Sequence, residues 1–213
     1  MTGSLENVLN GYQRPWLTDV DISLLAKGTP DSRYSQIKRL LAQDKLLHIR
    51  RGLYCFGDRM GQRVKPHPFE LAQYIYGPSY ISLEAALGFH GLIPEAVYEI
   101  TSVCIKRSKV FNTPLGIFSY AHLPIENFYL DVDIVTANNA RFFVAKPWKA
   151  ICDYVFCYKK DWTGLEPLFE SLRIDPDELP TLGDKEMEML DAYYHNQRIS
   201  IFLKKIKNEM TGV

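Results

Sequence analysis

The chain has 213 residues, 46% of them hydrophobic, and its 25 basic and 25 acidic side chains give a formal net charge of zero. That length accommodates one large domain or two modest ones, and the apolar content argues against extensive disorder. No apolar run reaches the roughly 20 residues that span a bilayer and the first ten residues lack the pattern of a secretory signal, so we expect a cytoplasmic protein with no membrane partner.

The balanced charge conceals a division along the chain. Residues 1–65 contain eleven Lys/Arg and six Asp/Glu, whereas residues 66–213 contain fourteen and nineteen. The two segments therefore carry formal charges of +5 and −5. Such asymmetry indicates a nucleic-acid-binding segment joined to a part with another role.

Two short helices are predicted before residue 29. The first covers roughly residues 4–12. The second follows Thr18, which forms a capping-box pattern with Asp21, and it ends at Gly28. The apolar residues that recur at helical spacing in this second helix, and so are expected to face a core, are Val20, Leu24 and Leu25.

A third helix, predicted over residues 30–43, divides its surface into two faces. Thr29 caps it, and Pro30 occupies its first position, where a missing N–H costs nothing. The apolar face expected in the core consists of Tyr34, Ile37, Leu40 and Leu41. The opposite face carries hydrogen-bonding groups, namely Ser32, Ser35, Gln36, Arg39 and Gln43.

This polar face has the chemistry of a DNA-reading surface. A merely solvated helix would typically carry Glu/Lys pairs four residues apart, and Glu is absent here. Arg and Gln can form two hydrogen bonds to guanine and adenine edges, and Ser hydroxyls suit phosphates. We therefore predict base contacts from Ser32, Ser35, Gln36 and Arg39, with backbone contacts from the flanking Arg33 and Lys38.

A β-hairpin is predicted directly after this helix, with strands at Leu46–Arg50 and Leu53–Phe56. The strands meet at Arg51-Gly52, because Gly tolerates the positive φ of a two-residue turn. A hairpin in this position is a wing, whose tip arginines commonly reach phosphates or the minor groove. Residues 1–58 are thus predicted to form a winged helix-turn-helix domain that binds double-stranded DNA, with Arg50 and Arg51 on the backbone.

Residues 66–213 are predicted to form a larger mixed α+β domain that folds on its own, reached through a Gly- and Pro-rich linker at 57–70. Its first part holds one helix, a Gly-Pro break and a second helix capped by Ser82. Strands are expected at 97–105, 116–123, 131–137 and 140–146. Helices follow from Pro147, ending in one long helix over residues 184–210.

The residue pattern shows no catalytic, metal or cofactor site, so we expect no enzyme activity. The histidines and four cysteines lack metal-ligand spacing, and phosphate-binding and hydrolase motifs are absent. One alternative is a metal-dependent nuclease that uses Asp131, Asp133 and Lys146. That arrangement needs an acid two residues before the lysine, where Val144 stands.

One further basic patch, Lys106, Arg107 and Lys109, lies outside the first domain. The interpretation that involves no function is a solvated charged loop. The functional interpretation is contact with RNA, a nucleotide or a protein partner.

Four segments resemble the AbiE-type antitoxin family of type IV toxin–antitoxin systems, and they cover most of the chain in the family's order. They are "SRYSQIKRLLAQDKLLHIRRGLYCF", "YISLEAALGFHGLIPE", "ITSVCIKRSKVFNTPLGIFSYAHL" and "AKPWKAICDYVF". The resemblance implies a transcriptional repressor that binds its own operator, and a C-terminal domain that counters a nucleotidyltransferase-type toxin. It also implies a role for a basic C-terminal helix containing Arg198, Lys204, Lys205 and Lys207. The main alternative is a winged helix used as a protein–protein interaction module.

Overall fold

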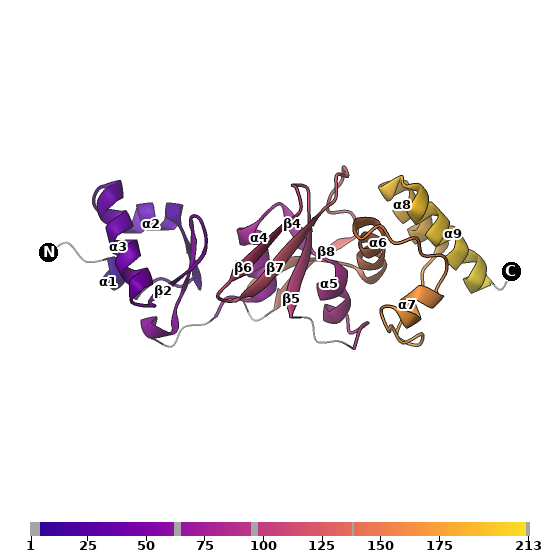
Figure 1. Cartoon of the computed structure of the whole chain (residues 1–213), viewed down its shortest axis with the longest axis horizontal. Helices are drawn as coiled ribbons and strands as arrows, with labels where there is room; N and C mark the ends of the chain where they lie inside the picture. Colours follow the sequence, from indigo (N-terminus) through magenta and orange to yellow (C-terminus); the bar gives the residue numbers. More distant parts are fainter. Residues whose placement is uncertain (1–4, 62–64, 95–97, 138, 212–213) are drawn as a thin grey trace.

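The computed structural model describes residues 5–61, 65–94, 98–137 and 139–211 and has a mixed α+β architecture. Two parts follow one another along the long axis of the molecule (Figure 1). We call residues 5–61 the N-terminal unit and residues 65–211 the C-terminal body. The expected α+β class is confirmed.

The N-terminal unit alternates short helices with a small antiparallel sheet. Its elements are α1 (Leu5–Leu9), β1 (Trp16–Thr18), α2 (Asp19–Leu25), α3 (Pro30–Ala42), β2 (Leu46–Arg50) and β3 (Leu53–Phe56), followed by a 3-10 turn, η1 (Asp58–Met60). The two expected hairpin strands lie at their predicted positions. β1 was not predicted, and it pairs with β3 to give the strand order β1-β3-β2.

Local sequence signals set the ends of these elements. Thr18 and Asp21 form the predicted capping box, in which each side chain accepts a hydrogen bond from the other's backbone N–H. The Thr29 hydroxyl accepts from the N–H of Ser32, and α3 starts with proline. At the hairpin turn Gly52 has φ +74°, and a Cβ there would come within 2.8 Å of the Asp19 carboxylate.

The apolar faces predicted for α2 and α3 are partly wrong. Val20 and Leu24 are 67% and 81% exposed, and Ile22 is the side chain of α2 that enters the core. A helix of seven residues buries only a narrow stripe, which Ile22 fills, and the predicted Leu25 is half-buried against the same core. On α3, Ile37 and Leu40 are buried as expected and Leu41 is half-buried, but Tyr34 is 67% exposed.

The C-terminal body is built on a six-stranded mixed sheet with strand order β6-β7-β5-β4-β9-β8. The strands are β4 (Ser79–Ile81), β5 (Glu99–Cys104), β6 (Lys109–Thr113), β7 (Gly116–His122), β8 (Val132–Ala137) and β9 (Ala140–Ala145). β4 pairs parallel with β9, and β5 with β7, while the other pairs are antiparallel. β4 and β6 were not predicted, because β4 has only three residues and β6 is an edge strand with a mostly polar, exposed sequence.

Helices flank this sheet and extend beyond it at the C-terminal end (Figure 1). They are α4 (Pro68–Ile75), α5 (Leu83–Phe89), α6 (Pro147–Cys157), α7 (Glu166–Glu170), α8 (Asp184–Tyr194) and α9 (Gln197–Thr211). The single helix predicted over 184–210 is two helices, because His195 adopts a left-handed conformation and ends α8. Ser82 stands at the start of α5, but its hydroxyl does not cap that helix as predicted.

Apolar contacts cross from the N-terminal unit into the body. Trp16, Ile49, Leu53 and Cys55 belong to the same buried cluster as the core of the body. The Trp16 ring also lies 4.7 Å from the ring of Tyr74 at the end of α4. The separation of the chain into independent domains stays a prediction, and the back of the hairpin is packed against the body.

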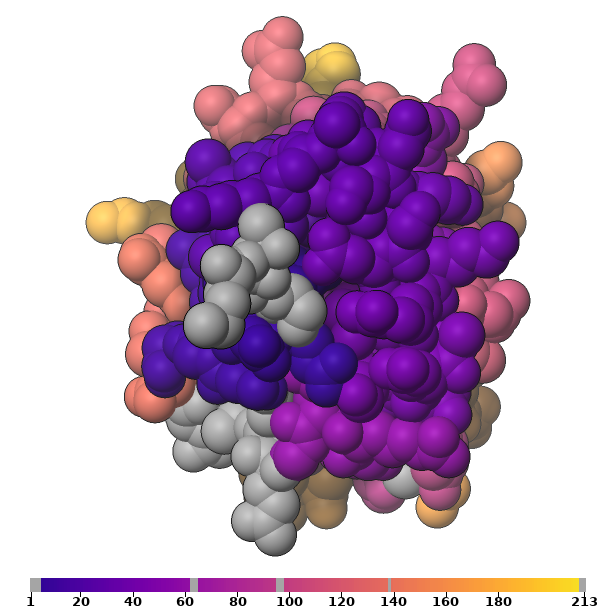
Figure 2. Space-filling view, turned by 90° about the vertical axis from the view of Figure 1, so that its left-hand side faces the viewer, coloured from indigo at the N-terminus to yellow at the C-terminus, as the bar shows by residue number. Residues whose placement is uncertain are grey.

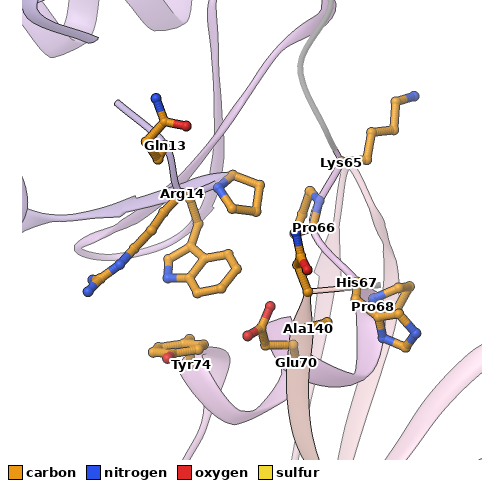
Figure 3. Close-up of a pocket in the computed structure, with 12 residues that line it drawn as sticks. Gln13, Arg14, Lys65, Pro66, His67, Pro68, Glu70, Tyr74 and Ala140 are labelled. Atoms are coloured by element: carbon orange, nitrogen blue, oxygen red, sulfur yellow. The ribbon is translucent and has the colours of Figure 1, made fainter. Parts of the chain in front are cut away.

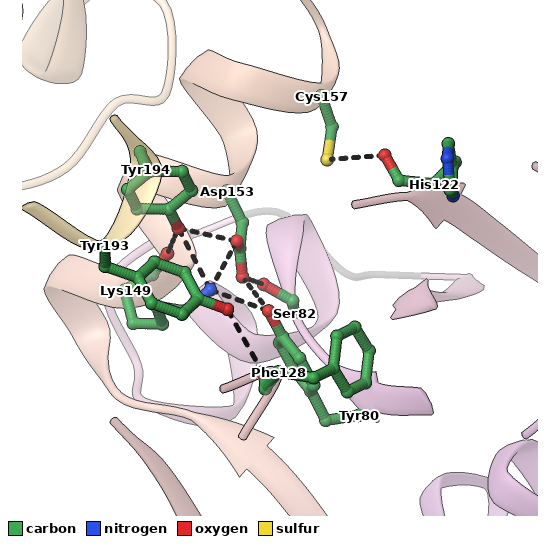
Figure 4. A network of polar contacts seen from close by, with 9 residues as sticks. All are labelled: Tyr80, Ser82, His122, Phe128, Lys149, Asp153, Cys157, Tyr193 and Tyr194. Carbon is green, nitrogen blue, oxygen red and sulfur yellow. Dashed lines mark hydrogen bonds and ion pairs between the residues drawn. The ribbon is translucent and has the colours of Figure 1, made fainter. Parts of the chain in front are cut away.

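A buried polar network holds the centre of the body together (Figure 4). Lys149 and Asp153, one turn apart on α6, form an ion pair of 2.5 Å with both side chains fully buried. Asp153 also accepts from the hydroxyls of Tyr80, Ser82 and Tyr194, and the Lys149 ammonium donates to both tyrosine oxygens. Burial raises the pKa of Tyr80 and Tyr194 well above 10, so both hydroxyls keep the protons that they donate.

Because each charge depends on the other, single substitutions are expected to destabilise the protein strongly. Asp153→Leu should lower the free energy of unfolding by about 3–5 kcal/mol by leaving a buried unpaired ammonium. The double variant Lys149→Met with Asp153→Leu should recover a large part of that loss. Urea denaturation of both variants checks this, and a double variant no more stable than Asp153→Leu would contradict it.

Candidate nucleic-acid interface

The outward face of α3 lies at the end of the molecule formed by the N-terminal unit. Figure 2 looks at this end, and residues from the first part of the chain, coloured indigo to purple, cover most of the face. Ser32, Ser35, Lys38 and Arg39 are exposed on α3. Among the described residues, no carboxylate forms an ion pair with Lys38 or Arg39. These four side chains are free to meet a ligand.

Two other predicted contact residues of α3 are engaged within the protein. The side-chain Oε1 of Gln36 accepts a 2.9 Å hydrogen bond from the N–H of Leu5, at the start of α1. The Arg33 guanidinium donates to the carbonyl of Gly28 at 3.1 Å. Gln36 therefore stabilises the packing of α1 on α3, and Arg33 supports the turn before α3. Sequence spacing had placed Gln36 on the polar face and Arg33 beside that face, without showing these partners.

The two arginines at the hairpin tip have different surroundings. The Arg50 guanidinium donates to the carbonyl of Tyr74 at 2.9 and 3.3 Å and to the carbonyl of Arg51 at 2.6 Å. Arg50 thus ties the hairpin to the end of α4 in the body. Arg51 is exposed, and no described carboxylate pairs with it.

A groove of about 610 Å³ is lined by α2, the first half of α3 and the hairpin tip. Cationic side chains on its walls include Arg33 and Arg51, and His48 contributes an imidazole. Asp19 and Asp31 also line it, so its charge is mixed. The groove is bounded by Tyr34, an exposed aromatic side chain that sequence analysis had placed in the core.

A second hollow, of about 710 Å³, lies at the junction between the two parts of the molecule (Figure 3). Gln13 and Arg14 come from the N-terminal unit, while Lys65, Glu70 and Tyr74 come from the body. Its lining combines both charge signs with several prolines. This mixture selects no single class of ligand.

The two further basic patches differ in how far their charges are compensated. Lys106, Arg107 and Lys109 are exposed, and no described carboxylate forms an ion pair with them. On α9, Arg198 pairs with Asp161 and Lys207 with Asp184. Lys204 and Lys205 are exposed on the same helix.

The residues of the nuclease alternative are brought together only in part. Lys146 forms a 2.8 Å ion pair with Asp131, whereas Asp133 is exposed on β8. Val144, two residues before the lysine, is buried in the sheet. Among the residues that the structure describes, no three His, Cys, Asp or Glu side chains are grouped so that they could hold a metal ion.

The four cysteines are free, and burial raises the pKa of the Cys55 thiol to about 12, so that thiol stays protonated near neutral pH. Within the described parts of the chain, no helix is long and apolar enough to span a membrane. Comparison with models of known protein families and with curated proteins finds no match for this chain.

The different surroundings of the two hairpin arginines predict different effects on stability. Arg50→Ala should lower the free energy of unfolding by about 1 kcal/mol, because it removes the hydrogen bonds to Tyr74. Arg51→Ala should change it by less than about 0.5 kcal/mol, as an exposed substitution. Parallel urea denaturation of the two variants measures the difference, and equal effects would contradict the role given to Arg50.

Proposed function

We propose that the protein is a DNA-binding transcriptional repressor whose N-terminal unit acts as a winged helix-turn-helix domain. The observation that carries this proposal is an exposed, cationic and hydrogen-bonding α3 face beside a β-hairpin with an exposed arginine at its tip. In this reading α2 and α3 are the helix-turn-helix, α3 enters the major groove, and β2 and β3 form the wing.

The proposed contacts follow the surroundings of each side chain. Arg39, Ser32 and Ser35 are exposed on α3 and would meet base edges or nearby phosphates. Lys38 and Arg51 would meet phosphates. Gln36, Arg33 and Arg50 would act mainly by holding α1, the preceding turn and the hairpin in place, since each bonds within the protein.

The resemblance to AbiE-type antitoxins supports a second part of the proposal. The repressor would bind the operator of its own operon, and the C-terminal body would counter a nucleotidyltransferase-type toxin. The exposed Lys204 and Lys205 on α9 are the first side chains to test for that role. The experiment first expresses the product of each adjacent gene alone to find one that arrests growth, and then co-expresses it with this protein. Growth arrest despite co-expression would contradict the antitoxin role.

One observation favours an interaction module instead. Val20, Leu24 and Tyr34 are large apolar side chains of the N-terminal unit with at least 67% of their surface exposed. Exposed apolar groups of this size favour contact with a protein partner. Under this alternative, Leu24→Ser would abolish partner binding, whereas a DNA-binding protein would keep its affinity for DNA in that variant.

Arg39→Ala distinguishes specific from general DNA binding. On the operator, found by selection from random duplexes, this variant should lose about 1–3 kcal/mol of binding free energy, because a bidentate base contact carries discrimination. On unrelated duplex DNA it should lose much less. Fluorescence anisotropy at fixed salt measures both affinities.

The matched control for this prediction is Arg141→Ala, which removes an exposed arginine from β9 in the body. It should leave both affinities close to those of the wild-type protein. Equal losses on both DNAs for Arg39→Ala would make Arg39 a phosphate contact, and no binding to any selected duplex would overturn the repressor proposal.

A further inference from the structure

Three cations gather in the turn that leads into β6. Lys106, Arg107 and Lys109 fall within four residues, and every residue from 105 to 110 is exposed. We call these three side chains the basic turn. Residues 66–213, which contain all of the body except Lys65, have a formal charge of −5. A concentrated, uncompensated positive site on an acidic body calls for a ligand of negative charge.

Specific contacts hold the basic turn in shape. The Lys106 ammonium donates to the carbonyl of Gly77 at 2.5 Å and lies 5.2 Å from the centre of the Tyr76 ring. The Tyr76 hydroxyl in turn donates to the carbonyl of Arg107 at 3.2 Å. Lys109 lies over the rings of Tyr76 and Phe111, at 5.9 and 4.8 Å. The end of α4 and the residues after it therefore position the turn.

The end of α4 also contacts the hairpin. Arg50 bonds to the carbonyl of Tyr74, two residues before the tyrosine that supports the basic turn. Strands β2 and β6 are also in contact with each other, and the hairpin faces this edge of the sheet (Figure 1). Residues 74–77 thus contact both the hairpin, through Arg50, and the basic turn, through Tyr76 and Gly77.

We propose that the basic turn binds the phosphate backbone of the operator next to the wing, so that both parts of the molecule hold one duplex. This inference rests on the proposed DNA-binding function. A duplex fits better than a small anion because the three cations are exposed over four residues, and the strand that begins at Lys109 contacts the hairpin whose tip carries the exposed Arg51. Flexible Lys and Arg side chains reach phosphates without reading sequence.

The experiment uses the full chain with Lys106, Arg107 and Lys109 all changed to Gln. Binding to the selected operator is measured over a range of salt concentrations, and hydroxyl-radical footprints are recorded at saturation. The absolute slope of log Kd against log salt should fall by about two to three, since each phosphate contact contributes about 0.9. Protection should disappear from backbone positions beside the wing and persist where α3 lies.

Matched controls separate a local effect from a general loss of charge. The variant Lys185→Gln, Lys204→Gln, Lys205→Gln removes three exposed cations from α8 and α9, far from the hairpin (Figure 1). Its slope and footprint should match the wild type. The single variant Arg107→Gln removes a cation whose side chain makes no described contact, and it should lower the slope by about one without a change in melting temperature.

The outcomes are distinguishable from failure of the repressor proposal. If the wild type binds the operator and the triple variant keeps its slope and footprint, the basic turn does not contact DNA. Unchanged DNA binding with lost toxin protection would assign the turn to a protein partner and overturn the inference. If the wild type binds no duplex, the proposed function falls, and this inference with it.

Discussion

Lys149 and Asp153 are fully buried, and their ion pair is stabilised there because the ammonium and both carboxylate oxygens have hydrogen-bond partners. The two carboxylate oxygens accept four hydrogen bonds, and the ammonium donates three. Their partners come from β4, the start of α5, and α8. A pair that needs three other elements to be in place makes the packing of the body cooperative, since loss of any one leaves a buried charge short of a partner.

This network also determines where the hairpin can dock. Tyr80 places β4 at the centre of the sheet, and β4 follows α4 after the short turn at 76–78. The end of α4 presents the Tyr74 carbonyl to Arg50 and the Tyr74 ring to Trp16. The buried ion pair holds β4, and the turn at 76–78 links β4 to the end of α4. Through that link, the ion pair influences the orientation of the N-terminal unit, which contacts the end of α4.

The parts of the fold that could be predicted were those with local chemical signals. Thr18 with Asp21, Thr29 with Pro30, and Gly52 in the hairpin turn each act over a few residues, so spacing alone located them. β4 and β1 have three residues each and form only because a neighbouring strand pairs with them. Lys149 and Asp153 show the same limit, because an i,i+4 pair of opposite charge in a sequence is typical of an exposed helix surface.

The candidate site shows the same contrast. Helical spacing put Gln36 and Arg39 on one face of α3, but it could not show that Leu5 would donate to Gln36. The turn signal likewise placed Arg50 and Arg51 together without showing that Arg50 would donate to the backbone carbonyl of Tyr74. The apolar pattern failed for Val20 and Leu24 because a two-turn helix has more apolar residues than its narrow contact can bury.

In the proposed repressor, the two arginines at the hairpin tip have different roles: Arg50 fixes the hairpin to the body, and Arg51 contacts DNA. A wing that contacted DNA on a freely moving linker would lose conformational entropy on binding and so gain less from each phosphate contact. Arg50 removes part of that freedom in advance, because it fastens the hairpin to the body through a backbone carbonyl that no side-chain substitution can remove. Fixing the hairpin leaves Arg51 exposed. The carbonyl that holds Arg50 also lies two residues before Tyr76, on which the shape of the basic turn depends. In the proposed repressor, the residues that join the two parts of the molecule are thus also the ones that align its cations along one duplex.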